Sequence, residues 1–409
     1  MPSPLKSAVA ATLLVTLASC GGYGNDYFYG YPAFTVPNSI AVADVNADGT
    51  PDLLVATTLD QGVVNNPGFA NVILGQHATP GTFQSGVQYQ TTGANPSSIA
   101  VADLAGSGSF DVVIANYGSG SVTVFMHGAT AGTYQPGVDV ATGGVPNQVA
   151  IGSLNGGNPD IVVADASASG NVIVLFHDPA NPGKFLAPVM LPTTLTTSAV
   201  AIADVNGDGH PDIIAATYDS NGNNGAVLVF YQSASSPGTF AAPVSFPAGA
   251  QPQAVRVADI DGDGLLDLVV ANLGPGTDGT GMSGVSVLLQ DAANHGKFLA
   301  PVTYATQSGA VDVAVGDLNG DGKPDLVVAN FGPAPSGSVS VLLQNPATPG
   351  TFGAATNYPG FGQPLSVAIA DLNGDGHPDI AVADSATATV MLQSATTPGT
   401  FAQPVQVGQ

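Results

Sequence analysis

The chain has 409 residues, 44% of them apolar, and a net charge of −24 from 29 acidic and five basic residues. All of the acidic residues are aspartates. So few lysines and arginines cannot neutralise a phosphate backbone or hold the chain on anionic lipid, which argues against nucleic-acid binding and electrostatic membrane attachment. The 53 glycines and 32 prolines interrupt the chain every few residues. Because apolar residues beyond the N-terminus lack a sustained helical spacing, the composition predicts an all-β fold.

The first residues have the pattern of an export signal. Lys6 supplies a positive charge, residues 8–18 form an apolar segment too short to span a bilayer, and Leu-Ala-Ser-Cys ends it at Cys20. This tetrapeptide resembles the lipobox of bacterial lipoproteins, whose cysteine is lipidated. We expect a signal peptide at 1–19, then a lipidated Cys20 with a tether at 20–30. That places the protein at a bacterial outer membrane or cell surface, touching the membrane only through the lipid. The alternative is an ordinary secretory peptide that happens to contain the chain's one cysteine.

A nine-residue motif recurs through the rest of the chain. Its best-preserved copy, 371–379, reads Asp-Leu-Asn-Gly-Asp-Gly-His-Pro-Asp. Oxygen donors at positions 1, 3, 5 and 9, with a glycine at position 6 that brings the position 7 carbonyl round, are the ligands that Ca²⁺ takes from a short loop. Four further copies are intact, at 44–52, 204–212, 259–267 and 317–325.

We expect about five structural Ca²⁺ ions, one for each intact loop, and no other cofactor. The predicted ligands, with position 7 contributing its backbone carbonyl, are Asp44, Asn46, Asp48, Thr50 and Asp52; Asp204, Asn206, Asp208, His210 and Asp212; Asp259, Asp261, Asp263, Leu265 and Asp267; Asp317, Asn319, Asp321, Lys323 and Asp325; and Asp371, Asn373, Asp375, His377 and Asp379. Two further copies, 103–111 and 153–160, have lost donor residues, and we expect no metal there. An EF-hand is excluded because the glutamate at position 12 is missing and strands flank the loop.

The seven copies begin 50 to 59 residues apart, which is the period of a propeller blade. Each repeat has four β-rich runs, which in the last repeat are 366–370, 379–383, 388–392 and 401–407. Four strands in each of seven repeats predict a seven-bladed β-propeller of four-stranded antiparallel blades.

The motif is flanked by Ala-x-Ala-Asp and Pro-Asp-[IL]-x-[VA]-Ala, and Phe-Gly-Pro-Ala-Pro follows from residue 331. These features resemble the FG-GAP or VCBS repeat of integrin α-subunit propellers and many secreted bacterial proteins. The resemblance covers 31–409 and implies that the calcium loops join the first and second strands of each blade. At the chain ends, the aromatic stretch 27–36 and the segment 400–407 compete for one outer strand. We expect the C-terminal segment to complete blade 7 and the N-terminal stretch to lie against a face or serve as tether.

One charged pair is predicted near the propeller axis. The residue three places before the loop is alanine in six repeats and Arg256 in the fifth, and the residue five places before it is Asp312 in the sixth. Both positions share one face of the first strand because side chains alternate along a strand. We expect a structural ion pair between adjacent blades. The alternative is that both charges line a central ligand site.

The repeat pattern favours binding over catalysis. It contains no Ser-His-Asp or Cys-His constellation and no glutamate, so we assign no catalytic residue. Only an active site assembled from several blades would make the protein an enzyme. The connections on the face opposite the calcium loops are long in four blades, where they form either a binding surface or passive linkers: 58–71, 219–225, 272–284 and 330–337.

The integrin-like resemblance implies a monomeric, calcium-stabilised scaffold for binding or adhesion to a protein partner. The alternative is a carbohydrate-binding propeller, because some propellers of this repeat type hold sugars in pockets between blades. Sugar sites usually stack an aromatic ring on the sugar, and this chain has no tryptophan. Its phenylalanines near the fourth strands recur so regularly that they are expected to serve packing. In either case we place the partner on the face opposite the calcium loops.

Overall fold

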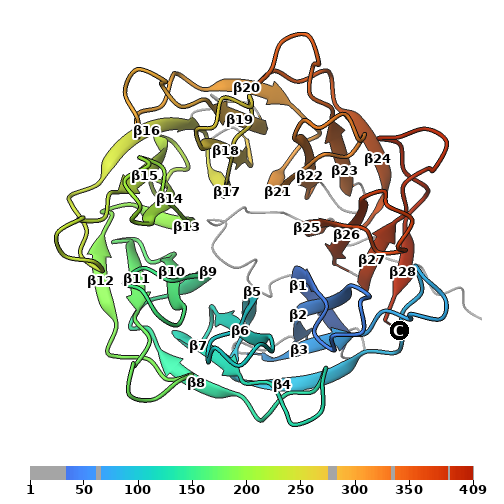
Figure 1. Cartoon of the computed structure of the whole chain (residues 1–409), viewed down its shortest axis with the longest axis horizontal. Coiled ribbons are helices and arrows are strands. Elements are labelled where there is room, and N and C mark those ends of the chain that lie inside the picture. Colours follow the sequence, from blue (N-terminus) through green and yellow to red (C-terminus); the bar gives the residue numbers. More distant parts are fainter. Residues whose placement is uncertain (1–33, 61–65, 275–282, 333–336, 386, 409) are drawn as a thin grey trace, which may run out of the picture.

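The computed structural model describes residues 34–60, 66–274, 283–332, 337–385 and 387–408. Seven four-stranded sheets stand around a central opening as the blades of a propeller (Figure 1). Within each sheet the strands lie side by side in chain order, and neighbours run antiparallel. The predicted seven-bladed, all-β fold is therefore confirmed. Among the described residues there is no helix that is long and apolar enough to cross a membrane.

Each blade contributes one strand to each of four concentric rings. The innermost strands are β1 (Phe34–Ala43), β5 (Pro96–Ala102), β9 (Pro146–Gly152), β13 (Thr196–Ala203), β17 (Pro252–Ala258), β21 (Ala310–Gly316) and β25 (Pro364–Ala370). The second strands are β2 (Asp52–Asp60), β6 (Asp111–Asn116), β10 (Asp160–Asp165), β14 (Asp212–Tyr218), β18 (Asp267–Asn272), β22 (Asp325–Asn330) and β26 (Asp379–Asp384). The third strands are β3 (Pro67–Ile73), β7 (Ser121–Phe125), β11 (Asn171–Leu175), β15 (Gly225–Phe230), β19 (Gly284–Leu288), β23 (Gly337–Leu342) and β27 (Thr387–Met391). The outer strands are β4 (Val87–Ala94), β8 (Val138–Ala141), β12 (Val189–Pro192), β16 (Val244–Gly249), β20 (Val302–Ala305), β24 (Thr356–Phe361) and β28 (Val405–Val407).

The hydrophobic core lies between the blades. Second strands such as β18 and β22 are apolar runs buried along their whole length, because a neighbouring blade covers each face of the sheet. The buried apolar residues form seven clusters, and each cluster joins two adjacent blades, blades 7 and 1 included. The stability of every blade therefore depends on its neighbours.

The innermost strands are also joined by a recurring hydrogen bond between blades. The side chain five residues before the loop accepts it from a backbone N–H of the next blade's innermost strand. Five such bonds are described: Ile99 to Ser39 at 3.3 Å, Val149 to Ser98 at 3.3 Å, Val200 to Gln148 at 2.7 Å, Val367 to Asp312 at 3.1 Å and Ile40 to Ser366 at 3.4 Å. Blades 4 and 5 have Ala199 and Ala254 at this position, which cannot accept a bond.

The ring closes without a strand shared between the two chain ends. Blade 7 consists of β25 to β28, so the C-terminal segment completes it as predicted. Residues 27–33 of the aromatic stretch lie outside the described residues, and residues 34–36 extend the innermost strand β1 instead of forming an outer strand. Closure depends on the core cluster shared by blades 7 and 1 and on the hydrogen bond from Ile40 to Ser366.

The long connections are only partly described. Much of the connection expected at 58–71 is paired strand, because β2 continues to Asp60 and β3 begins at Pro67. In blade 4, the Asp219 carboxylate closes the connection by accepting hydrogen bonds from the backbone of Asn221 and Asn223, each at 2.9 Å. Residues 61–65, 275–282 and 333–336 of the other connections lie outside the described residues.

Candidate metal centre

Each of the seven loops joins the first and second strands of its blade, as the family resemblance implies. The carboxylate at position 1 gathers backbone N–H groups from the turn. In blade 4, Asp204 accepts hydrogen bonds from Gly207 at 2.8 Å, Asp208 at 3.1 Å and Gly209 at 2.7 Å. Gly207 and Gly209 have φ of 72° and 85°, which glycine adopts without steric cost. The turn therefore wraps around the position 1 carboxylate.

Positions 3 and 5 continue the same hydrogen-bonded arrangement. In blade 4, the amide oxygen of Asn206 accepts a bond from the Asp208 backbone at 2.9 Å, and Asp208 accepts one from the His210 backbone at 2.9 Å. The bond from position 7 to position 5 recurs in the other four intact loops, whose position 7 residues are Thr50, Leu265, Lys323 and His377. The side-chain oxygens predicted as ligands are thus held in place by the loop's own backbone.

The aspartate at position 9 begins the second strand and is buried. In blade 4, the Asp212 carboxylate accepts one backbone hydrogen bond from Val205 at 3.2 Å and another from Gln232, at the end of the third strand, at 2.8 Å. Burial raises the pKa of this aspartate to about 6 in all five intact loops, at Asp52, Asp212, Asp267, Asp325 and Asp379. Burial disfavours the charged form of the carboxylate. A cation beside it would lower the free-energy cost of keeping it ionised.

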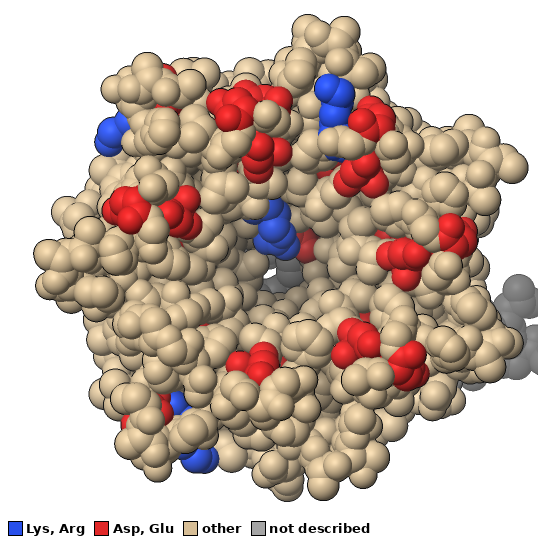
Figure 2. Space-filling view, viewed as in Figure 1, with Lys and Arg blue, Asp and Glu red and all other residues tan. Residues whose placement is uncertain are grey.

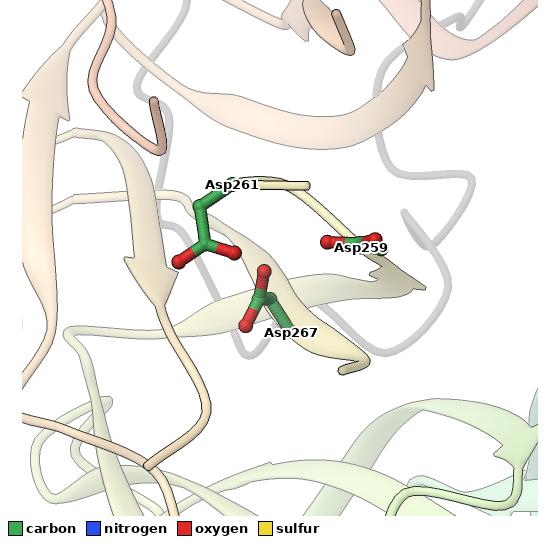
Figure 3. A group of neighbouring side chains, drawn as sticks. All are labelled: Asp259, Asp261 and Asp267. Atoms are coloured by element: carbon green, nitrogen blue, oxygen red, sulfur yellow. The ribbon is translucent and has the colours of Figure 1, made fainter. Parts of the chain in front are cut away.

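Three carboxylates converge in the loop of blade 5, which is the most acidic of the seven. Asp259, Asp261 and Asp267 each place an oxygen within 4.8 Å of the others (Figure 3). Calcium ligands lie about 2.3 to 2.6 Å from the ion, so oxygens on opposite sides of one ion are about 5 Å apart. Burial, and the charges of Asp263 and Asp259, raise the pKa of Asp261 above its usual value. The residues present therefore fit a hard divalent cation such as Ca²⁺.

The two damaged loops keep the buried aspartate but surround it differently. Asp111 in blade 2 and Asp160 in blade 3 are fully buried, and each lies next to a histidine. The Nδ1 atom of His127 lies 2.8 Å from Asp111, and that of His177 lies 2.9 Å from Asp160. The five intact blades have Gly75, Gln232, Gln290, Gln344 and Gln393 at this position.

The sequence reasoning did not identify these two contacts. The available signal was a correlation along the chain, because His127 and His177 occur in the two blades whose loops have lost donors.

Two of the intact loops are hydrogen-bonded to the segment between the third and fourth strands of the following blade. Gly132 of blade 2 donates a hydrogen bond to the Val45 carbonyl in the blade 1 loop at 3.1 Å. Gln344 of blade 6 donates one to the Ile260 carbonyl in the blade 5 loop at 2.9 Å. Loops and turns therefore share one face, and Figure 2 shows acidic side chains in separate clusters around the central opening. Folding of one loop is coupled to its neighbour's turn.

The predicted charged pair does meet between blades 5 and 6. An Nη2 atom of Arg256 lies 2.6 Å from Asp312, whose side chain is 9% exposed against 32% for the arginine. The other Asp312 oxygen accepts hydrogen bonds from the Ser366 hydroxyl at 2.9 Å and the Val367 backbone at 3.1 Å. The pair thus links three consecutive blades. Cys20, the predicted lipidation site, lies outside the described residues.

Comparison with known proteins gives one family and several structures with the same fold. The family of FG-GAP-like repeats matches residues 154–215, 204–270, 274–328 and 322–382. No curated protein matches the chain.

Three solved structures share the propeller at low sequence identity. A lectin, BP39L from Burkholderia pseudomallei, is 16% identical with a TM-score of 0.64, over 91% of this chain and 99% of the lectin. A Bacteroides uniformis protein proposed to be a 6-phosphogluconolactonase is 16% identical with a TM-score of 0.58, over 87% and 96%. BBS1N, solved in complex with ARL6DN, is 12% identical with a TM-score of 0.52, over 90% and 98%. These neighbours include a lectin, a proposed enzyme and a protein bound to a partner, so their likeness shows the fold alone.

Proposed function

Because the chain belongs to the FG-GAP-like repeat family, we propose that it is a calcium-stabilised scaffold that binds a protein partner. In this proposal the protein is exported, acts as a monomer and is held at a bacterial outer membrane or cell surface by a lipid on Cys20. The observation that carries the calcium assignment is the convergence of Asp259, Asp261 and Asp267 in blade 5. Three carboxylates at this distance repel one another, and a divalent cation between them offsets the repulsion.

The calcium is structural in this proposal. Each loop's donor oxygens are held by its own backbone, and the loops of blades 1 and 5 also contact the next blade through the position 2 carbonyl, so the ion would stabilise the first hairpin of a blade and, in these two, its contact with the next. Isothermal titration of Ca²⁺ into the chelated protein measures the number of sites directly. We expect about five ions in the five intact loops and none in the two damaged ones. Failure to bind any ion at millimolar calcium would contradict the assignment.

The binding role rests on how the two faces differ. Five of the seven loops on one face share one length and motif, whereas the connections on the other face differ from blade to blade in length and sequence. Variable loops on a rigid scaffold are where binding surfaces are usually built. Cross-linking on intact cells, followed by binding measurements with the purified partner, tests this role. A partner that binds equally well after the connections of blades 4 and 5 are shortened would show that this face is not the binding surface.

A lectin is the second candidate, because the Burkholderia lectin shares the fold over nearly the whole chain. A glycan array probed in calcium and again in chelator separates the two candidates. A sugar bound only in calcium would favour the lectin, whereas no sugar bound in either condition would favour a protein partner. Catalysis in a site assembled from several blades has the least support, because identity with the proposed lactonase is only 16%.

A further inference from the structure

Among the described residues, aromatic pairs fill four of the seven interfaces between blades. In each pair, the third residue of an outer strand packs edge-on against the aromatic residue in the next blade's turn. The pairs are Tyr89 with Tyr134 at 5.5 Å between ring centres, Phe246 with Phe298 at 5.1 Å, Tyr304 with Phe352 at 5.3 Å and Tyr358 with Phe401 at 5.9 Å. The planes cross at 80° to 87°, the edge-to-face arrangement that aromatic rings prefer.

Between blades 2 and 3 the first ring of this pair is missing. The third residue of β8 is Val140, and a groove of about 340 Å³ opens there beside Phe185 and Met126. Phe185 is half-buried in this groove, and Val138 and Lys184 beside it are exposed. An apolar cavity of about 150 Å³ is enough to bind benzene. The groove therefore has room for one aromatic ring.

The interface between blades 4 and 5, which has both rings, also has a lysine at the position of Lys184. The residue before the turn aromatic is Lys184 in blade 3, Lys297 in blade 5 and threonine in the other five blades. The Nζ atom of Lys297 lies 5.8 Å from the ring centre of Tyr231 and 6.0 Å from that of Phe246, within the range of a cation–π interaction.

Lys184 stands at the same place in the groove, but Met126 and Val140 replace the two rings that Lys297 covers. In the part of the chain that the structure describes, no ring or carboxylate pairs with Lys184. The other two interfaces that lack the outer ring, with Leu191 and Val407 in its place, have a threonine here. Only the groove between blades 2 and 3 combines a missing ring with a lysine.

We propose that this groove binds an aromatic side chain of a protein partner, in the position that Phe246 takes between blades 4 and 5. The guest ring meets Phe185 edge-on, and the Lys184 ammonium covers its face. Asp139 points to the other side of the blade 2 sheet, where it accepts a hydrogen bond from the Thr123 hydroxyl at 2.6 Å, so the groove recognises the guest by its ring. The inference rests on the proposed role as a protein-binding scaffold, and it adds a contact on the side of the calcium loops to the surface proposed on the opposite face.

The chain has no tryptophan, so the fluorescence of an added indole can be followed without background. We would titrate the full chain in calcium into N-acetyltryptophanamide and expect a saturable shift of its emission to shorter wavelength. Lys184→Thr introduces the residue of the other blades and should weaken binding about 2- to 5-fold, the factor supplied by an exposed cation–π contact. Lys297→Thr is the matched control and should leave binding unchanged.

Val140→Tyr is the decisive variant, because it builds into the groove the ring that blade 5 has at Tyr304. It should abolish probe binding and raise the melting temperature, which also shows that the variant is folded. Val140→Leu copies blade 3 and should weaken binding less. Unchanged binding by Val140→Tyr would overturn the proposal. Binding of methyl glycosides, but not of the indole, in a manner that Val140→Tyr blocks would overturn it in favour of a sugar.

The same variant separates failure of this inference from failure of the proposed function. A partner that binds wild type and Val140→Tyr equally well would overturn the groove assignment and leave the scaffold role in place. Conversely, a groove that binds the indole in a protein for which cell-surface cross-linking finds no partner would overturn the scaffold role alone.

Discussion

At the residue scale, the aspartate that ends each loop has two tasks. Its carboxylate accepts backbone hydrogen bonds that join the loop to the third strand, and in the intact loops it is also a proposed calcium ligand. In blade 5, Asp267 accepts from Ile260 at 2.8 Å and from Gln290 at 2.7 Å while it is 1% exposed. The first task needs no metal, so the two tasks can be separated by experiment.

Asp267→Asn should lower the free energy of unfolding by about 1 to 3 kcal/mol even in chelator. The new amide NH₂ cannot accept a hydrogen bond, so one of the two buried backbone N–H groups that Asp267 pairs is left without an acceptor. Asp263→Asn is the control, since its remaining oxygen still accepts from Leu265 and the side chain is exposed. That variant should lose stability only when calcium is present. Urea denaturation with and without EGTA measures both effects. Equal losses for the two variants in chelator would show that the buried hydrogen bonds carry no separate contribution.

His177 and His127 should stabilise blades 3 and 2 independently of metal. His177→Gln introduces the residue found in four intact blades and removes the imidazole contact with Asp160, while the backbone N–H of residue 177 still donates to that carboxylate. A hydrogen bond to a charged group contributes about 1.5 to 3 kcal/mol, and we expect His177→Gln to lose that amount. Thermal melting should show the same loss in calcium and in EGTA. A loss seen only in calcium would mean that the damaged loop of blade 3 still binds an ion.

At the element scale, the innermost strands are connected by side chains, because a strand at the axis has no hydrogen-bonding partner strand on its inner side. Serine, glutamine and aspartate fill this role at five interfaces. Between blades 5 and 6, where Ala254 cannot accept a bond, Arg256 reaches Asp312 instead. The ion pair takes the place of the missing hydrogen bond at this interface, whereas blade 4, which has Ala199 at the accepting position, has Ala201 where blade 5 has Arg256.

Arg256→Ala should lower the free energy of unfolding, because it leaves the buried Asp312 carboxylate without its cation. We expect a loss of about 1 to 3 kcal/mol, which lies between the values for exposed and for buried ion pairs. Adding Asp312→Ser should recover most of the loss, since serine occupies this position in blades 1, 2 and 7. Chemical denaturation of both variants measures the recovery. An unchanged melting temperature for Arg256→Ala would favour the alternative that the pair lines a central ligand site.

At the scale of the whole molecule, the ring has no blade that can unfold alone. Every core cluster contains residues of two blades. A loop that contacts the turn of the next blade also stabilises that turn when the loop is ordered. Closure between blades 7 and 1 uses the same contacts as the other interfaces instead of a strand from the opposite end of the chain. The molecule should therefore unfold as a unit.

Removing calcium should lower the melting temperature of one cooperative transition and should not produce a second transition. A ligand that binds only the folded state adds about 2.7 kcal/mol per site at 100 times its dissociation constant, so several sites together give a large shift. Differential scanning calorimetry across a calcium series, with excess EGTA as the starting point, records the shift. Two separate transitions would contradict the coupling between blades, and no shift would contradict the calcium assignment.

The sequence by itself determined the fold, the blade count and the place of each loop. These are local properties, since a loop such as 371–379 marks the end of one strand and the start of the next, and seven copies set the period. It also paired Arg256 with Asp312, because repeat position translates into position around the axis.

Only the tertiary structure showed that His177 lies against Asp160 and that Lys184 lies beside a missing ring at Val140. These contacts join a loop to a distant strand end, or one blade to the next, and each depends on a single departure from the repeat. A repeat pattern predicts what its copies share. The individual substitutions that distinguish one interface from another acquire meaning only when packing places them side by side.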